Sequence, residues 1–271
     1  MKNLLKLLTP RPFDAHKGLF GHVLIVGGAP GMLGATILAA QAASYVGAGL
    51  VTVATHPSHA ALVSCTHPHI MSFGVRNSEE LQPLLGKASI VAIGPGLGKD
   101  EWAHTLFATV LASKLPLLID ADGLNLLAEQ PLQRDNWILT PHPGEAARLL
   151  KLDSKTIQQD RVASVTLLQN NYGGVAVLKG AGSLIKGVDT ECIKCAAGNP
   201  GMAIGGMGDL LSGVIAGLVA QHLTLFDAAA LGAHLHAHAG DLLAQAQGQR
   251  GMLPQDLLPV LRRLVNSDNT I

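Results

Sequence analysis

Short apolar runs alternate with helical stretches along most of this 271-residue chain, and that order restricts its fold more than any other feature. Strands are predicted at residues 22–26, 50–55, 89–94, 115–120 and 136–140, and a β-hairpin at 175–180 and 183–187. Helices are predicted near residues 34–46, 57–63, 102–112 and 122–130, with two or three more at the end of the chain. Apolar strands separated by helices are typical of a mainly parallel sheet covered by helices on both faces. We therefore predict the α/β class and, since no repeat or linker interrupts the pattern, one domain over residues 1–271.

The charge distribution excludes two classes of partner. The formal net charge is zero and no basic patch is present, which argues against binding to nucleic acid. Residues 18–75 contain no Asp, Glu, Lys or Arg, and hydropathy alone would mark residues 34–54 as a membrane span. Gln41, Ser44 and the glycines at 47 and 49 divide that span into a helix and a strand of globular length, so we predict no membrane segment.

Composition also bears on location and assembly. Three cysteines, an odd number, do not suggest a disulfide framework and fit a reducing compartment. The first apolar run is broken by Lys6 and ends at Thr9, too early for a secretory signal, so a cytoplasmic location is expected. With 48% hydrophobic and 14% charged residues, little charge is left to cover a monomer, and we expect a homo-oligomer.

Glycine-rich or polar clusters follow the predicted strands: GGAPGMLG, GPGLG, DADGLN, TPHPGE and KGAGS. Ligands bind at the carboxyl ends of strands in open parallel sheets, so these loops are expected to converge on one site. The first cluster is not a dinucleotide-binding fingerprint, because its glycines fall as G-G-x-x-G-x-x-G around Pro30 and the second strand ends without an acidic residue. A P-loop is excluded because its motif does not occur. The GPGLG loop is compatible with a plain turn or with close approach to a ligand.

Two histidine motifs stand out. In TPHPGE, two prolines fix the backbone around His142, which favours a ligand contact over a purely structural role. In HLHAH, His234 and His238 share a helix face, with Asp241 one turn further. A metal site is possible there, but no third strong ligand is evident, so packing or a ligand contact is favoured and no metal ligand is assigned.

The stretch GNPGMAIGGMGDLLSGVIAG, residues 198–217, carries a single charged residue, Asp209, where a glycine run enters an apolar helix. Free N–H groups and the positive end of the helix dipole form an anion hole for phosphate there. Asp209 is either a helix cap or a base that accepts a proton from a hydroxyl attacking a phosphoryl group. Capping does not require Gly205, Gly206 and Gly208 together, so the stretch predicts phosphoryl transfer to a small-molecule hydroxyl.

This stretch resembles the GxGD signature of the ribokinase-like superfamily, and nearly the whole chain is similar to the ATP/ADP-dependent NAD(P)H-hydrate dehydratases. The resemblance rests on HKGLFGHVLIVGG, GAGLVTVATHP, AIGPGLG, DADGLNLLA, TPHPGEAARLL, GGVAVLKGAGSLI, AGNPGMAIGGMGDLLSGVIAGLVAQ and RGMLPQDLLPVL. It implies repair of hydrated NADH or NADPH: a nucleotide phosphorylates the ring hydroxyl, phosphate leaves, and the cofactor is restored. The residues alone predict the phosphoryl transfer, whereas the elimination rests on the resemblance.

The resemblance also implies roles for individual residues. Asp209 is implied as the catalytic base beside the substrate. The implied contacts to the hydrated cofactor are Ala35, Gly96 and His142, and those to the adenine nucleotide are Lys179, Gly180, Ala181, Gly182, Ser183 and Gly208. Asn125, Glu145 and Gly206 are expected to support the site. ADP or ATP is the implied co-substrate, with Mg²⁺ as its default ion.

Two alternatives remain beside this interpretation. One is a kinase of the same superfamily that leaves phosphate on a small-molecule product; the other is a non-catalytic nucleotide-binding or dinucleotide-binding module, for which a carboxylate beside bound phosphates has no use. Many relatives carry an epimerase domain before the dehydratase; here the dehydratase motif lies within twenty residues of Met1, so a separate NAD(P)H-hydrate epimerase is expected. The preference for ADP or ATP, and for hydrated NADH or NADPH, stays open.

Overall fold

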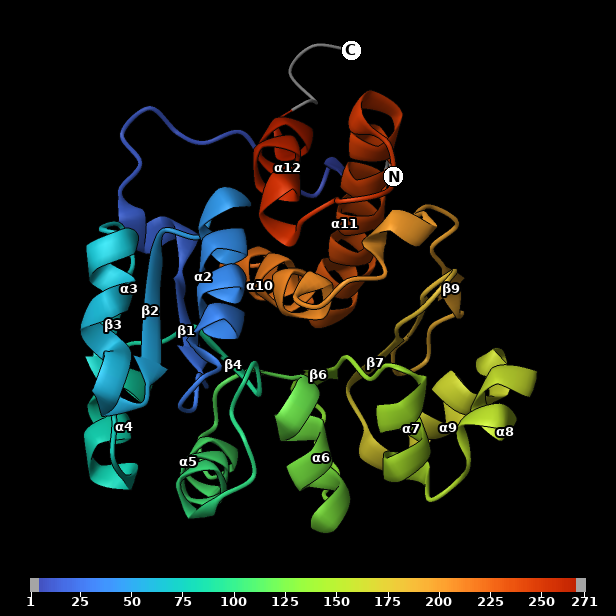
Figure 1. The fold of residues 1–271 in the computed structure, drawn as a ribbon, viewed down its shortest axis with the longest axis horizontal. Helices are drawn as coiled ribbons and strands as arrows, with labels where there is room; N and C mark the ends of the chain where they lie inside the picture. The colour runs from blue at the N-terminus through green and yellow to red at the C-terminus, as the bar shows by residue number, and fades with distance from the viewer. Residues whose placement is uncertain (1–4, 267–271) are drawn as a thin grey trace.

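One sheet, with strand order β3-β2-β1-β4-β5-β6-β7-β8-β9, forms the centre of a computed structural model that describes residues 5–266 (Figure 1). Neighbours from β3 to β7 pair in parallel, and β8 and β9 are added antiparallel. The strands are β1 (His22–Val26), β2 (Leu50–Thr55), β3 (Met71–Gly74), β4 (Ile90–Ile93), β5 (Leu117–Ile119), β6 (Trp137–Leu139), β7 (Val175–Leu178), β8 (Leu184–Lys186) and β9 (Ile193–Lys194).

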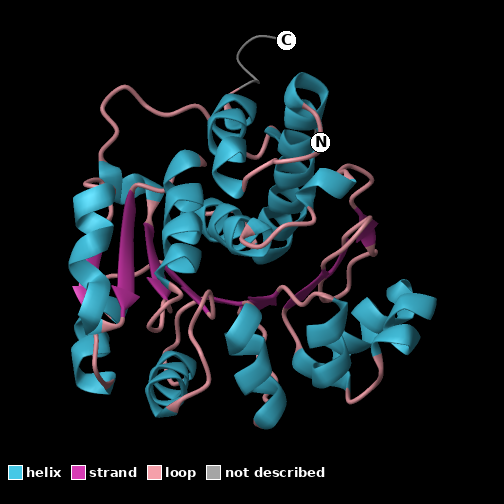
Figure 2. Ribbon diagram, viewed as in Figure 1, coloured by secondary structure: helices cyan, strands magenta, loops and turns pink. Residues whose placement is uncertain are grey.

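Helices cover both faces of this sheet, as Figure 2 shows. One face carries α2 (Leu33–Tyr45), α10 (Met207–Ala220), α11 (Leu225–Gln247) and α12 (Leu257–Val265). The other carries α4 (Ser78–Leu85), α5 (Glu101–Leu111), α6 (Ala121–Glu129), α7 (Pro143–Leu150), α8 (Ser154–Gln159) and α9 (Arg161–Tyr172). Helix α3 (Ala60–Thr66) packs beside β3 at the edge, and 3₁₀ turns lie at Lys17–Phe20, Pro57–His59, Pro200–Met202 and Pro254–Asp256.

Strand residues alternate between the two hydrophobic layers. Val23 and Ile25 face the α2, α10 and α11 layer, whereas Leu24 and Val26 face the α4 to α9 layer, and all four are fully buried. A strand covered on both sides requires apolar residues at every position, which explains why β1 reads as a continuous apolar run. The predicted parallel α/β sheet and the β7–β8 hairpin are therefore confirmed.

Strands β3 and β9 were not predicted from the sequence. Met71 and Phe73 in β3 are partly exposed at the edge of the sheet, and β9 has only two residues, so neither forms the long buried run that marks the inner strands. The predicted strand at 136–140 and the helix near 57–63 are present as β6 and as a 3₁₀ turn followed by α3.

The uncharged stretch 18–75 includes β1, α2 and β2, as predicted from its glycine break. No helix within residues 5–266 is both long enough and apolar enough to cross a membrane. Helix α2 instead packs on the sheet beside α10, where small residues allow the two helix backbones to approach closely. A Cβ placed on Gly213 of α10 would lie 2.0 Å from the carbonyl oxygen of Ala39 in α2, and one on Gly217 would lie 2.8 Å from that of Ala43.

We expect Gly213→Ala to lower the free energy of unfolding by about 1–3 kcal/mol or more, because the added methyl group overlaps backbone that cannot move aside. Gly86→Ala is the matched control, since Gly86 has an ordinary φ of −62° and the atoms nearest to a Cβ added there would lie 3.9 Å away. The control should change stability by no more than about 0.5 kcal/mol. Urea unfolding of both variants measures the difference; equal stabilities would contradict this account of the α2–α10 contact.

Candidate active site

Two glycine loops meet where the strand order reverses, between β1 and β4. The N–H of Gly28, after β1, donates to the carbonyl of Pro95 at 3.0 Å, and the N–H of Ala29 donates to that of Gly96 at 2.7 Å. A Cβ on Gly96 would lie 3.3 Å from the Cβ of Ala35, so these two predicted substrate contacts are neighbours. Such a reversal leaves a crevice at the carboxyl edge of an α/β sheet, which is the usual place for a ligand.

A buried ion pair lies further along the same edge. The Nζ of Lys179, just after β7, is 2.5 Å from Oδ1 of Asp120, just after β5, and 3.9 Å from Oε2 of Glu145. The hydroxyl of Ser212 in α10 donates to Oδ2 of Asp120 at 2.7 Å. Burial lowers the pKa of Lys179, but the charge of Asp120, with that of Glu145, outweighs it, so the net shift is upward and Lys179 is protonated.

Asp209 lies in the first turn of α10 beside this ion pair. The N-cap of α10 is Gly206, with φ of +93°, and no side-chain cap hydrogen bond is made, so Asp209 does not cap this helix. Burial, and then the negative charge of Asp120, raise the pKa of Asp209 to about 7, although Lys179 opposes the shift. A carboxyl group with that pKa is well matched to exchange a proton with substrate near neutral pH.

A side chain would be crowded at Gly206 and at Gly208, whereas Gly205 has open space around it. A Cβ on Gly206 would lie 2.6 Å from Cδ1 of Leu38, and one on Gly208 would lie 3.3 Å from Nζ of Lys179. The first N–H groups of α10 have no acceptor inside the helix, so together with the helix dipole they form an anion-binding position beside Lys179 and Asp209.

His142 is the N-cap of α7 and forms a capping box with Glu145. Its Nδ1 accepts hydrogen bonds from the N–H groups of Gly144 and Glu145, while Oε2 of Glu145 accepts from the N–H of His142 at 2.8 Å. Burial, followed by the charges of Lys179 and Arg148, lowers the pKa of His142. The neutral ring therefore carries its proton on Nε2, which lies 3.4 Å from Oε1 of Glu145. The His142 side chain is half exposed, so Nε2–H can also face a ligand.

Burial also raises the pKa of Glu145, with the charge of Asp120 adding to the shift. Asp120, Glu145 and Asp209 thus share one buried lysine, which cannot neutralise three carboxylates. The excess of carboxyl groups keeps protons bound at this site near neutral pH.

The predicted nucleotide segment, residues 179–183, forms the turn between β7 and β8. Gly180 and Gly182 both have positive φ, and the hydroxyl of Ser183 donates to the carbonyl of Gly180 at 3.1 Å. Arg161 of α9 supports the turn, because its Nη2 donates to the carbonyl oxygens of Leu178, Lys179 and Gly182. Ala181 lies at the exposed tip of this turn.

Asn125 links two loops at the same edge of the sheet. Its Oδ1 accepts from Nη1 of Arg148 at 2.9 Å, and its Nδ2 donates to Asp122 at 3.4 Å. Asp122 in turn accepts from the N–H of Gly98 at 2.9 Å, which ties the loop after β4 to the start of α6. Asn125 thus contributes to loop geometry rather than contacting the Lys179 cluster directly.

The structure gathers the predicted residues along one sheet edge and adds others that the motifs did not single out. Asp120 stood in the quoted cluster DADGLN without an assigned role, and Ser212 and Arg161 lie in helices whose sequence gives no local signal of a site. In the HLHAH segment, His236 is the buried histidine, whereas His234 bonds to the carbonyl of Ala230 within its own helix. Within residues 5–266, no group of three or more His, Cys, Asp or Glu side chains is arranged to hold a metal ion.

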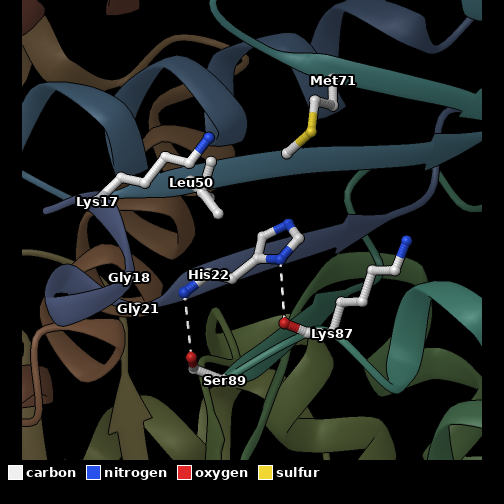
Figure 3. Close-up of a pocket in the computed structure, with 8 residues that line it drawn as sticks. All are labelled: Lys17, Gly18, Gly21, His22, Leu50, Met71, Lys87 and Ser89. Carbon is white, nitrogen blue, oxygen red and sulfur yellow. Dashed lines mark hydrogen bonds between the residues drawn. The ribbon is translucent and has the colours of Figure 1, made fainter.

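A separate hollow lies at the opposite edge of the sheet (Figure 3). It is lined by Lys17, Gly18, Gly21, His22, Leu50, Met71, Lys87 and Ser89, several of which begin or precede strands. His22 bonds through Nδ1 to the carbonyl of Lys87 and through Nε2 to the hydroxyl of Thr52, so its ring is fully occupied. The hollow is at the amino ends of the strands, away from the glycine loops, and does not belong to the candidate site.

Comparisons with known proteins all lead to one protein family. A profile of the NAD(P)H-hydrate dehydratase family matches residues 23–263. A bifunctional NAD(P)H-hydrate repair enzyme from Coxiella burnetii is 54% identical over 265 residues, covering 98% of this chain and 54% of its own length. The chain thus spans about half the length of this relative and of similar bifunctional enzymes from Vibrio cholerae and Escherichia coli.

Two solved structures extend the comparison. A ribokinase-like superfamily protein from Enterococcus faecalis superposes with a TM-score of 0.88 at 32% identity, covering 98% of this chain and 94% of its own. An ADP/ATP-dependent NAD(P)H-hydrate dehydratase from Bacillus subtilis, co-crystallized with ATP and Mg²⁺, superposes with a TM-score of 0.86 at 26% identity, covering 98% and 97%. The ribokinase-like fold predicted from the sequence is confirmed.

The two functions of His142 can be separated by mutation. Asparagine caps helices well but has no group in place of the imidazole Nε2–H, so His142→Asn should keep the melting temperature while raising KM for the substrate more than it lowers kcat. His142→Ala should also raise KM, and it should lower the free energy of unfolding by about 1 kcal/mol because the helix cap is lost. Steady-state kinetics and thermal unfolding of both variants measure this; a collapse of kcat at constant KM would instead assign His142 to the chemistry.

The raised pKa of Asp209 predicts a pH-dependent stability. A carboxyl group whose pKa is raised by folding stabilises the fold while it is protonated, and this contribution is lost as pH rises from about 4 through about 7. The asparagine in Asp209→Asn does not titrate. The free energy of unfolding of this variant, relative to that of the wild type, should therefore increase from pH 5 to 7.5 and then level off. After solvent screening, this increase should reach on the order of 1 kcal/mol.

Melting temperatures of the two proteins at half-unit steps from pH 5 to 8.5 provide the measurement. Glu145 titrates in both proteins, so its effect cancels in the difference. A difference that is constant across this range would mean that the pKa of Asp209 is not raised.

Proposed function

This chain belongs to the NAD(P)H-hydrate dehydratase family, and we propose that it uses ADP or ATP to convert (6S)-NAD(P)H hydrate back to NAD(P)H. The observation that carries the proposal is Asp209, a carboxyl group with a pKa of about 7 at the start of α10, next to the Lys179–Asp120 ion pair. The Bacillus subtilis structure, an ADP/ATP-dependent NAD(P)H-hydrate dehydratase, supports it over nearly the full length of both chains.

Asp209 acts in the first step as general base. The hydroxyl oxygen of the hydrated ring attacks the terminal phosphorus of the nucleotide, its proton passes to the Asp209 carboxylate, and the bond between that phosphorus and the remaining nucleotide breaks. Hydroxide is a poor leaving group and phosphate is a good one. In the second step the carbon–oxygen bond breaks, phosphate departs with the bonding electrons, and loss of a neighbouring ring proton restores the double bond.

The surroundings of Asp209 suit this step. The N-terminus of α10, with Gly206 and Gly208, faces the developing negative charge on the transferred phosphoryl group, and Lys179 supplies a fixed positive charge beside it. Asp120 and Ser212 hold Lys179 in position. Asp120 is buried and the Lys179 side chain is only 16% exposed, so their charges are screened less than on the surface.

The substrate and the nucleotide are assigned to neighbouring parts of the sheet edge. Ala35, Gly96 and His142 are proposed to contact the hydrated cofactor, with Asn125 and Glu145 supporting them, because they flank the crevice between β1 and β4 and the start of α7. Residues 179–183 and Gly208 are proposed to contact the adenine nucleotide. Mg²⁺ would enter with the nucleotide, which supplies phosphate ligands that this ion prefers over an all-protein site.

Several expectations from the sequence remain predictions. They are a single domain over residues 1–271, an NAD(P)H-hydrate epimerase in the same pathway, self-association into a homo-oligomer, and a cytoplasmic location. Partly exposed Met71 and Phe73 on the edge strand β3, with Leu62 of α3, are compatible with self-association. A small-molecule kinase of the same superfamily is the alternative function, and the descriptions of the relatives favour the dehydratase.

We expect the purified protein to restore NADH from its hydrate only when ADP or ATP and Mg²⁺ are added. The return of the absorbance of the reduced nicotinamide follows the reaction, and phosphate release should match it one to one. Asp209→Asn should lower kcat by roughly a hundredfold to ten-thousandfold, the usual contribution of a positioned base.

The same variant serves as its own folding control, since it should still be stabilised against heat by ADP. Accumulation of a phosphorylated alcohol without NADH would establish the kinase alternative. Turnover without nucleotide, or turnover by Asp209→Asn within about tenfold of the wild type, would contradict the proposed mechanism.

A further inference from the structure

His56, just after β2, and Trp102, in the first turn of α5, form an aromatic pair at the carboxyl edge of the sheet that the proposed mechanism does not use. Their ring centroids lie 5.7 Å apart at an interplanar angle of 74°, which is an edge-on contact. The indole N–H of Trp102 donates to the carbonyl of Val75 at 2.7 Å and fixes that ring. Both residues are only half-buried, so the pair is accessible to a planar group of a ligand.

Hydrogen bonds join His56 to the glycine loop after β1. Its backbone N–H donates to the carbonyl of Gly28 at 3.4 Å, and Nε2 of His59 bonds to the same carbonyl at 2.8 Å. The N–H of Gly28 in turn donates to the carbonyl of Pro95, in the loop after β4. His56 therefore lies beside the crevice between β1 and β4, on the side of β2.

The imidazole of His56 is fixed through one nitrogen. Its Nδ1 bonds to the hydroxyl of Ser58 at 2.8 Å and accepts from the N–H of Ser58 at 3.3 Å, and the ring of His59 lies 5.9 Å away between centroids. No hydrogen bond within residues 5–266 uses Nε2 of His56, so that edge of the ring is available. A ring that is already held in place loses little conformational entropy when a ligand binds against it.

The strand order places His56 at the end of the row of predicted substrate contacts. His142 follows β6, Gly96 follows β4 and His56 follows β2, so each is two strands from the next. Neighbouring strands lie about 4.8 Å apart, so the row spans about 19 Å. The predicted nucleotide turn, residues 179–183, lies on the other side of β6. A long substrate with its reacting end at Asp209 therefore extends away from the nucleotide and toward His56.

We propose that His56, positioned by Trp102, stacks against the adenine ring of the hydrated dinucleotide and so binds the half of the substrate that does not react. The inference rests on the proposed function, because it takes NAD(P)H hydrate as the substrate. That molecule carries the reacting ring at one end and adenine at the other, joined by two riboses and a pyrophosphate. Nucleobases stack readily on aromatic side chains, histidine included.

Two substrates separate this contact from the chemistry: hydrated NADH, and the hydrate of reduced nicotinamide mononucleotide, which lacks the adenosine half. His56→Ala should raise KM for hydrated NADH roughly 5- to 100-fold, the usual effect of removing a ring on which a base stacks, with little change in kcat. KM of the same variant for the hydrated mononucleotide should equal that of the wild type. Steady-state kinetics with ADP and Mg²⁺ measure these values.

Three further variants complete the test. His56→Phe keeps a flat ring and should keep KM for hydrated NADH within about threefold of the wild type. His56→Asn lacks the ring but can still accept the N–H of Ser58, so it replaces His56→Ala if melting shows that variant to be unfolded. His69→Ala is the matched control, because His69 makes a similar edge-on contact with His67, at 6.2 Å, in the loop that enters β3 at the opposite edge of the sheet. It should change neither KM.

Equal KM values of the wild type and His56→Ala for hydrated NADH would overturn the inference and leave the adenosine half in solvent. An equal rise in KM for both substrates would also contradict it, since the crevice rather than a contact with adenine would be disturbed. A rise in His56→Phe as large as in His56→Ala would exclude stacking. A wild-type protein that does not convert hydrated NADH would overturn the proposed function, and that result is distinct from all of these.

Discussion

The buried ion pair between Lys179 and Asp120 is the contact on which the arrangement of the site depends. It joins the end of β7 to the end of β5, and the hydroxyl of Ser212 extends it to α10. Two charges removed from water are held favourably only when both partners and their remaining hydrogen bonds are in place. Removing either residue would leave an uncompensated charge under the start of α10, so the position of the anion-binding turn and of Asp209 is tied to this pair.

The same pair explains the acid–base properties of the site. A single lysine faces Asp120, Glu145 and Asp209, and it is closest to Asp120. The two carboxyl groups that it neutralises less completely have raised pKa values. A base with a pKa near 7 therefore arises first from burial and second from the surplus of carboxyl groups over positive charge, and the fold tolerates both because Glu145 and Asp209 can take up protons.

Several side chains combine a structural and a proposed functional role. His142 and Glu145 form the capping box of α7, and Glu145 also faces Lys179. Asp209, by contrast, leaves capping to the backbone at Gly206. The glycines of this loop supply space and left-handed backbone, which lets Lys179 lie against Gly208. His142 caps α7 through Nδ1, and the contact of its Nε2 with substrate stays a prediction.

The sequence alone determined the class of fold, the edge of the sheet that carries the loops, and the candidate base. Apolar strand runs, glycine turns and helix periods are local signals, and each can be recognised within a few residues. The assignment of dehydration, rather than phosphoryl transfer alone, rested on the family resemblance, because elimination leaves no local pattern in the sequence.

Only the tertiary structure decided which residues meet. Strand order placed the reversal between β1 and β4, and pairing across the sheet brought together Asp120 and Lys179, 59 residues apart, and Asp120 and Ser212, 92 residues apart. It also turned His236 inward, although the spacing in HLHAH had drawn attention to His234 and His238. The charge on a buried carboxyl group and the partner of a buried nitrogen depend on neighbours that are remote in sequence, so local patterns do not contain them.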